Sequence, residues 1–168
     1  GGIFIWSSNI TLNNVVINRN QAIEEGGGIL MEYSNPEFNN ITIINNQASN
    51  GSGIFLNESN PKIINTTIVN NLNTISSLGS DLTLFMSNPI ILNSIIWGNY
   101  NSSGVYNIGG NSQPIITHSD IQDGWEGEGN INLNPLFTDP ENEDYTLQED
   151  SDCIDAGTAD LDGDGLED

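Results

Sequence analysis

The residues best suited to chemistry stand at the end of the chain, where DLDGDGLED runs from Asp160 to Asp168. Carboxylates at alternate positions, Asp160, Asp162 and Asp164, followed by a glycine that permits a sharp turn, form the first half of a calcium loop of EF-hand or dockerin type. Leu166 would offer its carbonyl at the seventh position, and Asp168 stands at the ninth. The acid expected at the twelfth position lies beyond the last residue. We therefore expect a structural calcium ion here, and the alternative is a solvated acidic terminus.

The candidates for catalysis do not assemble into a convincing set. A glycoside hydrolase needs two carboxylates about 5 to 10 Å apart. Asp120 and Asp123 are close in sequence, but their spacing on a strand would point them to opposite faces. His118 could serve as a general base, yet it shares a repeat position with asparagines and is better explained as a hydrogen-bonding corner residue. Cys153 is expected to pack as a small apolar side chain.

The charge of the chain restricts its partners. The 168 residues carry 23 acids against 2 bases, which gives a net charge of -21. Such a surface repels nucleic acid and anionic membranes. A polyuronate lyase would need a cationic base beside calcium-binding acids, whereas the two bases, Arg19 and Lys62, lie in different repeats. No run of about 18 apolar residues predicts a membrane span. We expect neither an enzyme nor a nucleic-acid-binding protein.

A repeated phrase of asparagine and isoleucine must supply the framework for these residues. It occurs about five times, at spacings of about 25 to 28 residues, with copies that begin at Asn9, Asn35, Asn60, Asn88 and Gln113. Three apolar columns keep register through the copies. They are Ile3, Ile29 and Ile54; Leu12, Phe38, Ile63, Ile91 and Ile116; and Ile17, Ile43, Ile68, Ile96 and Ile121.

Two polar columns keep the same register. One contains Asn14, Asn40, Asn65, Asn93 and His118, and the other contains Asn20, Asn46, Asn71 and Asn99. Asparagine tolerates left-handed backbone and both donates and accepts amide hydrogen bonds. We expect both columns to be structural ladders at buried bends.

The composition within each repeat predicts strands. Short runs rich in Ile, Val and Thr alternate between faces and are separated by Asn-Pro, Asn-Gly and Gly-Gly turns. The sequence therefore predicts an all-β parallel solenoid of about five coils over residues 1–124. Residues 125–159 are expected to form a C-terminal loop and capping segment, and residues 160–168 an irregular acidic tail.

The second half of the chain carries motifs of a known family. They are NSIIWGN at Asn93–Asn99, SDIQDGWEGEGNI at Ser119–Ile131, NPLFTDP at Asn134–Pro140, DYTLQ at Asp144–Gln148 and SDCIDAG at Ser151–Gly157. With the repeat, they make the chain resemble right-handed parallel β-helix repeat proteins of secreted bacterial type. One departure is Asp152, where that family usually has proline. The resemblance implies a secreted or surface-anchored protein, and it implies no particular activity.

Several asparagines begin the glycosylation pattern N-x-S/T. Asn50, Asn57 and Asn101 fall at expected turns and are the candidate acceptors. Asn40 and Asn65 match the same pattern, but we expect them to be buried in the ladder.

The favoured function is an extracellular structural or adhesive module, working as a stalk, adhesin or filament subunit. GGIFIWSSN at Gly1 begins at full repeat strength without a cap, so we expect either a preceding region or a neighbouring subunit to cover the first coil. A carbohydrate-binding module is the alternative. Its candidate stacking platforms are Trp6, Tyr33, Trp97, Tyr100, Tyr106 and Trp125. Trp97 follows a core strand and is expected to pack, so Trp125 in its glycine-rich loop is the expected exposed platform. A fragment of a polysaccharide lyase or hydrolase is a further alternative. A polysaccharide or a cell surface would be the partner in these cases.

Overall fold

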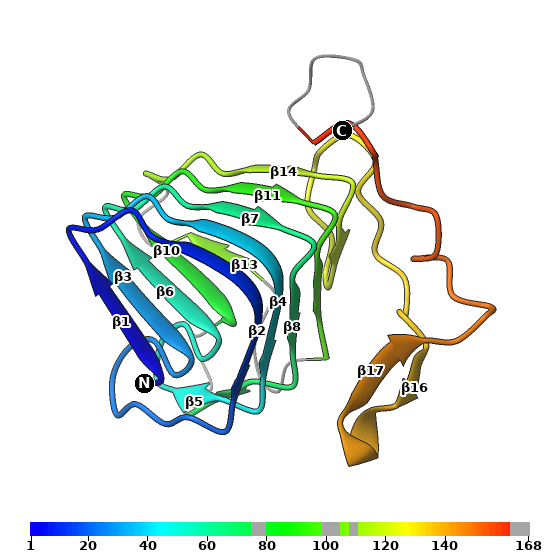
Figure 1. Cartoon of the computed structure of the whole chain (residues 1–168), viewed down its shortest axis with the longest axis horizontal. Coiled ribbons are helices and arrows are strands. Elements are labelled where there is room, and N and C mark those ends of the chain that lie inside the picture. Colours follow the sequence, from blue (N-terminus) through cyan, green and yellow to red (C-terminus); the bar gives the residue numbers. More distant parts are fainter. Residues whose placement is uncertain (75–79, 99–104, 108–110, 162–168) are drawn as a thin grey trace.

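Parallel strands wind into a stack of coils in which equivalent strands lie above one another (Figure 1). The computed structural model describes residues 1–74, 80–98, 105–107 and 111–161. The first sheet, in spatial order, consists of β1 (Ile3–Trp6), β3 (Ile29–Glu32), β6 (Ile54–Asn57), β10 (Leu82–Phe85) and β13 (Val105–Asn107). These five strands give the number of coils.

The second sheet forms the other long wall and bends at a corner. Its upper strands before the bend are β7 (Lys62–Ile64), β11 (Ile90–Leu92) and β14 (Ile115–Thr117), and those after it are β8 (Thr67–Val69), β12 (Ile95–Trp97) and β15 (Asp120–Ile121). In the first two coils β2 (Thr11–Asn18) and β4 (Glu37–Ile44) run through the bend without a break. A short third sheet pairs β5 (Gln47–Ala48) with β9 (Leu72–Asn73).

The apolar columns stack as the repeat predicts. Ile43 lies between Ile17 and Ile68 in the strand register, and Ile68 in turn pairs with Ile96. All four are at most 4% exposed. Like side chains over like side chains fill the interior with close-packed hydrocarbon, which is the main favourable contribution to folding here. The predicted all-β parallel solenoid is confirmed.

Each corner uses one residue in left-handed backbone. At the first corner these residues are Ser7, Tyr33, Glu58 and Met86; at the second, Asn14, Asn40, Asn65, Asn93 and His118; at the third, Arg19, Asn45, Asn70 and Gly98. Their φ values lie between 46° and 70°. Asparagine and glycine adopt this conformation at low cost, which explains their number at the second and third corners.

The third corner carries a buried asparagine ladder. Asn46 accepts hydrogen bonds from the Asn20 backbone N–H and side-chain amide, at 2.9 and 3.0 Å. It donates to the Asn71 side-chain oxygen at 3.1 Å and to the Ile17 carbonyl at 2.9 Å. Asn46 and Asn71 are fully buried, and Asn20 in the first coil is half-buried. Asn99, the next member of the predicted column, lies outside the described residues.

The second column differs from the expectation, because its first three asparagines face solvent, while Asn93 and His118 are half-buried. Asn14, Asn40 and Asn65 are exposed. Asn40 donates to Asn14 across the coils at 2.6 Å, whereas Asn65 donates to Asn39 at 3.1 Å. The prediction of a buried ladder was wrong at this corner. The left-handed residue turns its own side chain outward, and the residue after it points inward.

Hydroxyl ladders fill the inward corner positions instead. At the first corner the Ser34 N–H donates to Ser59 Oγ at 3.1 Å, and the Ser59 N–H donates to Ser87 Oγ at 3.0 Å. At the second corner the Ser94 N–H donates to Ser119 Oγ at 3.1 Å. Each of these hydroxyls also donates to the carbonyl two residues earlier. These bonds satisfy backbone groups that the bends remove from the strand ladders.

The loop after β15 covers the last coil. Trp125 packs against the apolar core, and the Ser119 N–H donates to Asn130 Oδ1 at 3.0 Å, so Asn130 replaces the next hydroxyl of the ladder. Ile131 pairs with Asp120 as a strand would. Trp125 therefore helps to cap the fifth coil and is half-buried, rather than freely exposed as the sequence suggested.

A buried carboxyl occupies the start of the fourth coil. Asp81 occupies the position that Gly28 and Gly53 hold in the second and third coils. The Gly28 N–H donates to the Gly53 carbonyl, and the Gly53 N–H donates to the Asp81 carbonyl. Its side chain is fully buried, Oδ1 accepts a hydrogen bond from Ser52 at 3.0 Å, and Oδ2 has no partner. Burial raises the pKa of Asp81 well above the ordinary value of 3.8, and the Ser52 bond only partly opposes this.

We predict that ionisation of Asp81 destabilises the folded protein as the pH rises. The folded protein holds the Asp81 proton more tightly than the unfolded chain does. The stability that protonated Asp81 contributes is therefore fully present below pH 3.8, and it is lost as the pH rises through the folded-state pKa. We expect Asp81→Asn to raise the free energy of unfolding at pH 8. At acid pH the free energies of unfolding of the variant and the unsubstituted protein should lie closer together. Urea unfolding at several pH values measures this. A variant less stable than the parent at pH 8 would contradict it.

Candidate functional site

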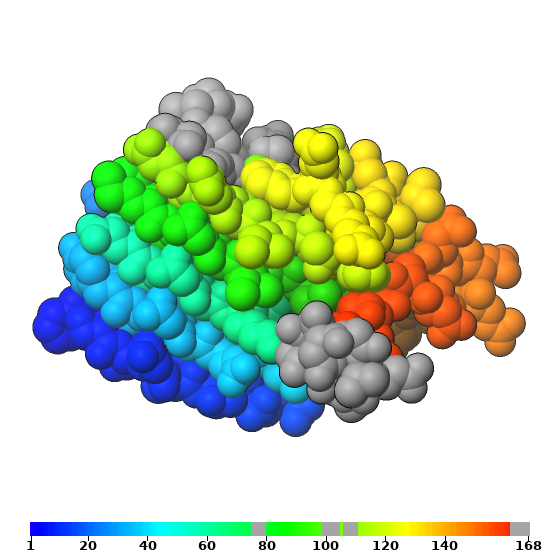
Figure 2. Space-filling view, turned by 90° about the horizontal axis from the view of Figure 1, so that it is seen from above, coloured from blue at the N-terminus to red at the C-terminus, as the bar shows by residue number. Residues whose placement is uncertain are grey.

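The chain returns along the side of the solenoid after the cap and creates two hollows. Figure 2 shows this C-terminal part, coloured yellow to orange-red, along one flank of the stack. It contains a hairpin of β16 (Phe137–Asp139) and β17 (Asp144–Leu147), joined by a 3-10 turn at η2 (Pro140–Asn142).

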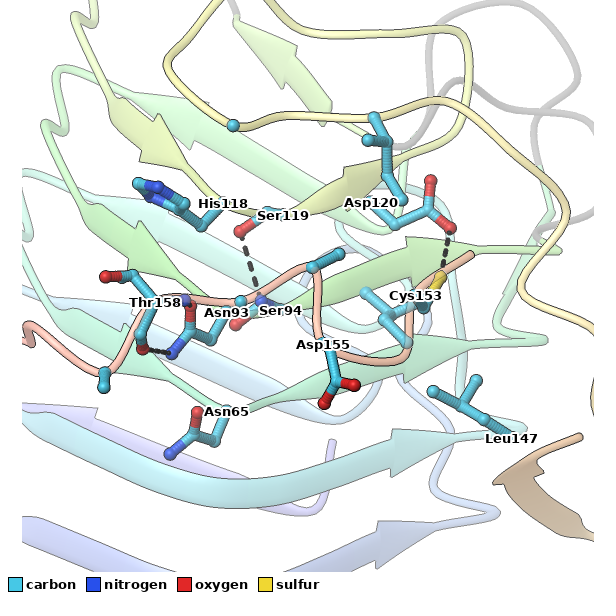
Figure 3. Close-up of a pocket in the computed structure, with 16 residues that line it drawn as sticks. Asn65, Asn93, Ser94, His118, Ser119, Asp120, Leu147, Cys153, Asp155 and Thr158 are labelled. Carbon is cyan, nitrogen blue, oxygen red and sulfur yellow. Dashed lines mark hydrogen bonds between the residues drawn. The ribbon is translucent and has the colours of Figure 1, made fainter. Parts of the chain in front are cut away.

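The first hollow lies between the second corner and residues 153–159, with a volume of about 440 Å³ (Figure 3). Asn93 fixes the returning chain, because its amide donates to the Thr158 carbonyl at 2.8 Å and its oxygen accepts the Thr158 N–H at 2.9 Å. Deeper in the hollow the Cys153 thiol donates to the Asp120 carboxylate at 3.2 Å. The returning segment is thus held by a residue predicted to serve only as a corner ladder.

The groups in this first hollow are tuned away from nucleophilic chemistry. Burial, and then the neighbouring Asp120, raise the pKa of the Cys153 thiol to about 12. Burial likewise raises the pKa of Asp120, although its hydrogen bonds from Cys153 and Leu133 oppose the shift. Because the thiolate is the reactive form of cysteine, Cys153 stays a protonated hydrogen-bond donor at neutral pH.

His118 and Asp120 both line the first hollow, whereas Asp123 does not. Gly129 lies against the His118 ring, where an added Cβ would come within 2.5 Å of Cδ2, and His118 Nδ1 is buried without a partner. Asp120 is buried while Asp123 is exposed in a turn. The spacing argument placed these two acids on opposite faces, and their different exposure agrees with it.

The second hollow, called here the hairpin groove, lies between the hairpin and the third corner and has a volume of about 860 Å³. Its walls combine aromatic rings with side-chain amides, chiefly Trp97, Phe137, Tyr145, Asn70 and Gln148. The rings of Phe137 and Tyr145 meet edge to face with centroids 5.3 Å apart. Such a mixture of apolar walls and few polar groups is typical of small-ligand sites.

A clasp closes the lower end of the hairpin groove. Glu143 accepts hydrogen bonds from Asn45 at 2.8 Å and from Asn18 at 3.2 Å, and it forms an ion pair with Arg19 at 2.7 Å. The acid and Asn18 are 125 residues apart in sequence. The hairpin that follows the fifth coil is therefore tied to the first and second coils.

We predict that loss of the Glu143 clasp loosens the hairpin locally without lowering the stability of the whole protein. Arg19 is 73% exposed, so the ion pair itself contributes at most about 1 kcal/mol in water. We expect Glu143→Gln to leave the melting temperature nearly unchanged but to speed amide hydrogen exchange in residues 136–148 several-fold. Glu141→Gln, an exposed acid on the same turn, is the matched control. Equal exchange in the two variants would show that the clasp does not hold the hairpin.

The remaining predicted site residues are only partly placed. Asp160 is half-buried, whereas Asp162, Asp164, Leu166 and Asp168 lie outside the described residues. Over the described chain no group of three or more His, Cys, Asp or Glu side chains could hold a metal ion. Within the same residues no helix is long and apolar enough to cross a bilayer.

The candidate glycosylation acceptors show a similar mixture. Asn50 and Asn57 are half-buried, and Asn101 lies outside the described residues. Asn40 and Asn65, expected to be too buried for a glycan, are the exposed ones. The expectation failed because it assigned both asparagine columns to the interior.

Comparison with known proteins agrees with the geometry. Residues 1–127 match the family model described as the right handed beta helix region. The chain belongs to the right-handed β-helix family. No curated protein and no solved structure matched the chain. In this β-helix the family match ends within the loop that caps the fifth coil, so the hairpin groove joins the coils to a segment beyond the family region.

Proposed function

We propose that this β-helix is an extracellular structural or adhesive module. The observation that supports it most is the continuity of its polar ladders. Hydroxyl side chains join successive coils at the first corner and the last three coils at the second corner, and asparagines join the first three coils at the third corner. The Glu143 clasp ties the end of the chain back to its beginning. The buried ladder groups thus join neighbouring coils, which supports a structural role.

The end of the stack at the fifth coil is covered by Trp125 and Ile131. Exposed strand edges readily accept another strand, and this cap covers that end of the stack. Growth of a filament from the fifth coil would therefore require displacement of the cap.

Immunolabelling of intact and permeabilised cells of the source organism tests the location. The proposal expects label on intact cells or in the culture medium. Label that appears only after permeabilisation would overturn an extracellular role. Electron microscopy of purified protein tests end-to-end association, which paired particles or filaments would support and particles that remain single and short would exclude.

Calcium remains a proposal for the acidic tail. Asp160 opens the DLDGDGLED string and is fixed by its backbone N–H, which donates to Thr158 Oγ1 at 3.2 Å. A calcium ion bound only by the folded chain at 100 times its Kd would stabilise it by about 2.7 kcal/mol. We expect added calcium to raise the melting temperature and Asp160→Asn to reduce that increase. Identical melting in calcium and in EDTA would exclude a structural ion.

A further inference from the structure

We propose that the hairpin groove binds an uncharged oligosaccharide. This inference extends the proposed adhesive role by naming a ligand class and a site for it. The groove is distinct from the capping loop of Trp125, which the sequence had suggested as the sugar platform. Its volume of about 860 Å³ is within the range of small-ligand pockets, about 300 to 1,000 Å³.

Three rings give the groove its apolar surface. Trp97 ends β12 and lines the groove from the coil side, while Phe137 and Tyr145 line it from the hairpin. All three are half-buried, so part of each ring remains accessible. The edge-to-face contact between Phe137 and Tyr145 holds their orientation, with an interplanar angle of 87°. The flat C–H face of a pyranose can pack on such fixed rings, because aromatic side chains bury a large apolar area.

An interrupted amide ladder supplies hydrogen-bonding groups beside these rings. Asn45 donates to Asn18 at 3.1 Å and Asn70 donates to Asn45, which forms a half-buried column along the third corner. Gly98 takes the next position, so the column stops at Asn70. No described residue donates to Asn70 Oδ1, which lines the groove next to Trp97.

The hairpin contributes a second amide in a fixed position. Gln148 Nε2 donates to the Phe137 carbonyl at 2.9 Å, which leaves its Oε1 without a donor from the described chain. Two oriented amide oxygens match the hydroxyl donors of a sugar, because each such oxygen can accept hydrogen bonds.

Charge selects against an acidic ligand. Glu141 and Glu143 line the groove together with Arg19, and the ion pair of Arg19 with Glu143 leaves Glu141 unbalanced. The whole chain carries a net charge of -21. Uronate polymers would be repelled by this field, whereas a neutral glycan would not.

Calorimetric titration of the full chain with cellohexaose, xylohexaose and chitohexaose tests the inference. Trigalacturonate serves as the anionic comparator. Trp97→Ala removes the central ring, and Asn70→Gly removes the amide but keeps the left-handed corner, as Gly98 already does one coil above. Trp6→Ala is the matched control, because its ring is 61% exposed on β1 and lies outside the groove.

We expect at least one neutral hexasaccharide to bind, with affinity about tenfold weaker in Asn70→Gly, a change of about 1.4 kcal/mol. Trp97→Ala should lose detectable binding and Trp6→Ala should retain it. No saturable binding of the three probes up to about 10 mM, ten times a weak Kd of about 1 mM, would overturn the inference. Binding that is unchanged in both groove variants, or binding of trigalacturonate alone, would also overturn it. None of these failures would affect the cell-labelling result, so the two proposals fail separately.

Discussion

Ile68→Ala is expected to lower the free energy of unfolding by about 4 kcal/mol, within the 2 to 5 kcal/mol usual for such core truncations. Ile68 is 1% exposed and stacks between Ile43 and Ile96 in the third coil. Removing its branched side chain would leave a cavity that the two flanking coils cannot fill without breaking their register. Chemical denaturation followed by circular dichroism measures the effect.

Ile23→Ala provides the control for this change. Ile23 is 89% exposed, so the same truncation removes almost no buried surface. We expect its effect to stay within about 0.5 kcal/mol. Similar losses from the two substitutions would show that the isoleucine stack does not carry the stability.

Asn46→Ala is the second large expected effect, with a loss of about 3 kcal/mol. The substitution removes the acceptor of the Asn20 backbone N–H and the donor to the Ile17 carbonyl. Each buried group left without a partner costs about 1 to 3 kcal/mol. The loss therefore comes from stranded backbone groups, and it should appear in the same denaturation experiment.

Asn13→Ala is the matched control for the ladder. Asn13 is exposed on β2, and its side chain makes no hydrogen bond to a described residue. We expect a change within about 0.5 kcal/mol. An Asn46→Ala variant as stable as Asn13→Ala would mean that water replaces the ladder without cost.

The sequence predicted the coils well because the same residue type recurs at the equivalent position of each coil. Isoleucine at position 43 is one of several equivalents with the same spacing, so the apolar columns were visible as a pattern before any packing was known. The third-corner ladder was visible for the same reason. Its inward asparagines, Asn46 and Asn71, follow the left-handed Asn45 and Asn70, and their recurrence at a spacing of 25 residues was the available signal.

The direction of a side chain at a corner could not be taken from the repeat. Asn40 and Asn46 have the same residue type and the same periodicity, yet one faces solvent and the other the interior. A left-handed φ of 56° at Asn40 decides the difference, and residue type alone does not report it. At the first corner the overlooked sign was the serine at the inward position, since Ser34 and Ser59 recur with the same period.

The hairpin groove and its clasp were out of reach for a different reason. Glu143 meets Asn18 and Asn45 only because the chain turns back after the fifth coil, and no repeat marks that return. The capping contact of Trp125 was missed because a glycine-rich loop predicts exposure, whereas the open end of the core attracts the nearest large apolar side chain. Contacts made by non-repeating segments need tertiary structure to be seen.

Paired spin labels on the outer face of the second sheet test the stacking of coils most directly. Thr11, Glu37, Lys62, Ile90 and Ile115 lie in one register column. In a Cys153→Ser background, labels at Thr11 and Ile90 should be separated by three strand spacings, about 14 Å, and labels at Thr11 and Ile115 by four, about 19 Å, before the label arms are added. The account predicts that the second mean distance exceeds the first by about 5 Å. Equal distances, or a shorter one for Ile115, would contradict the stacked coils on which the fold, the ladders and both proposed roles depend.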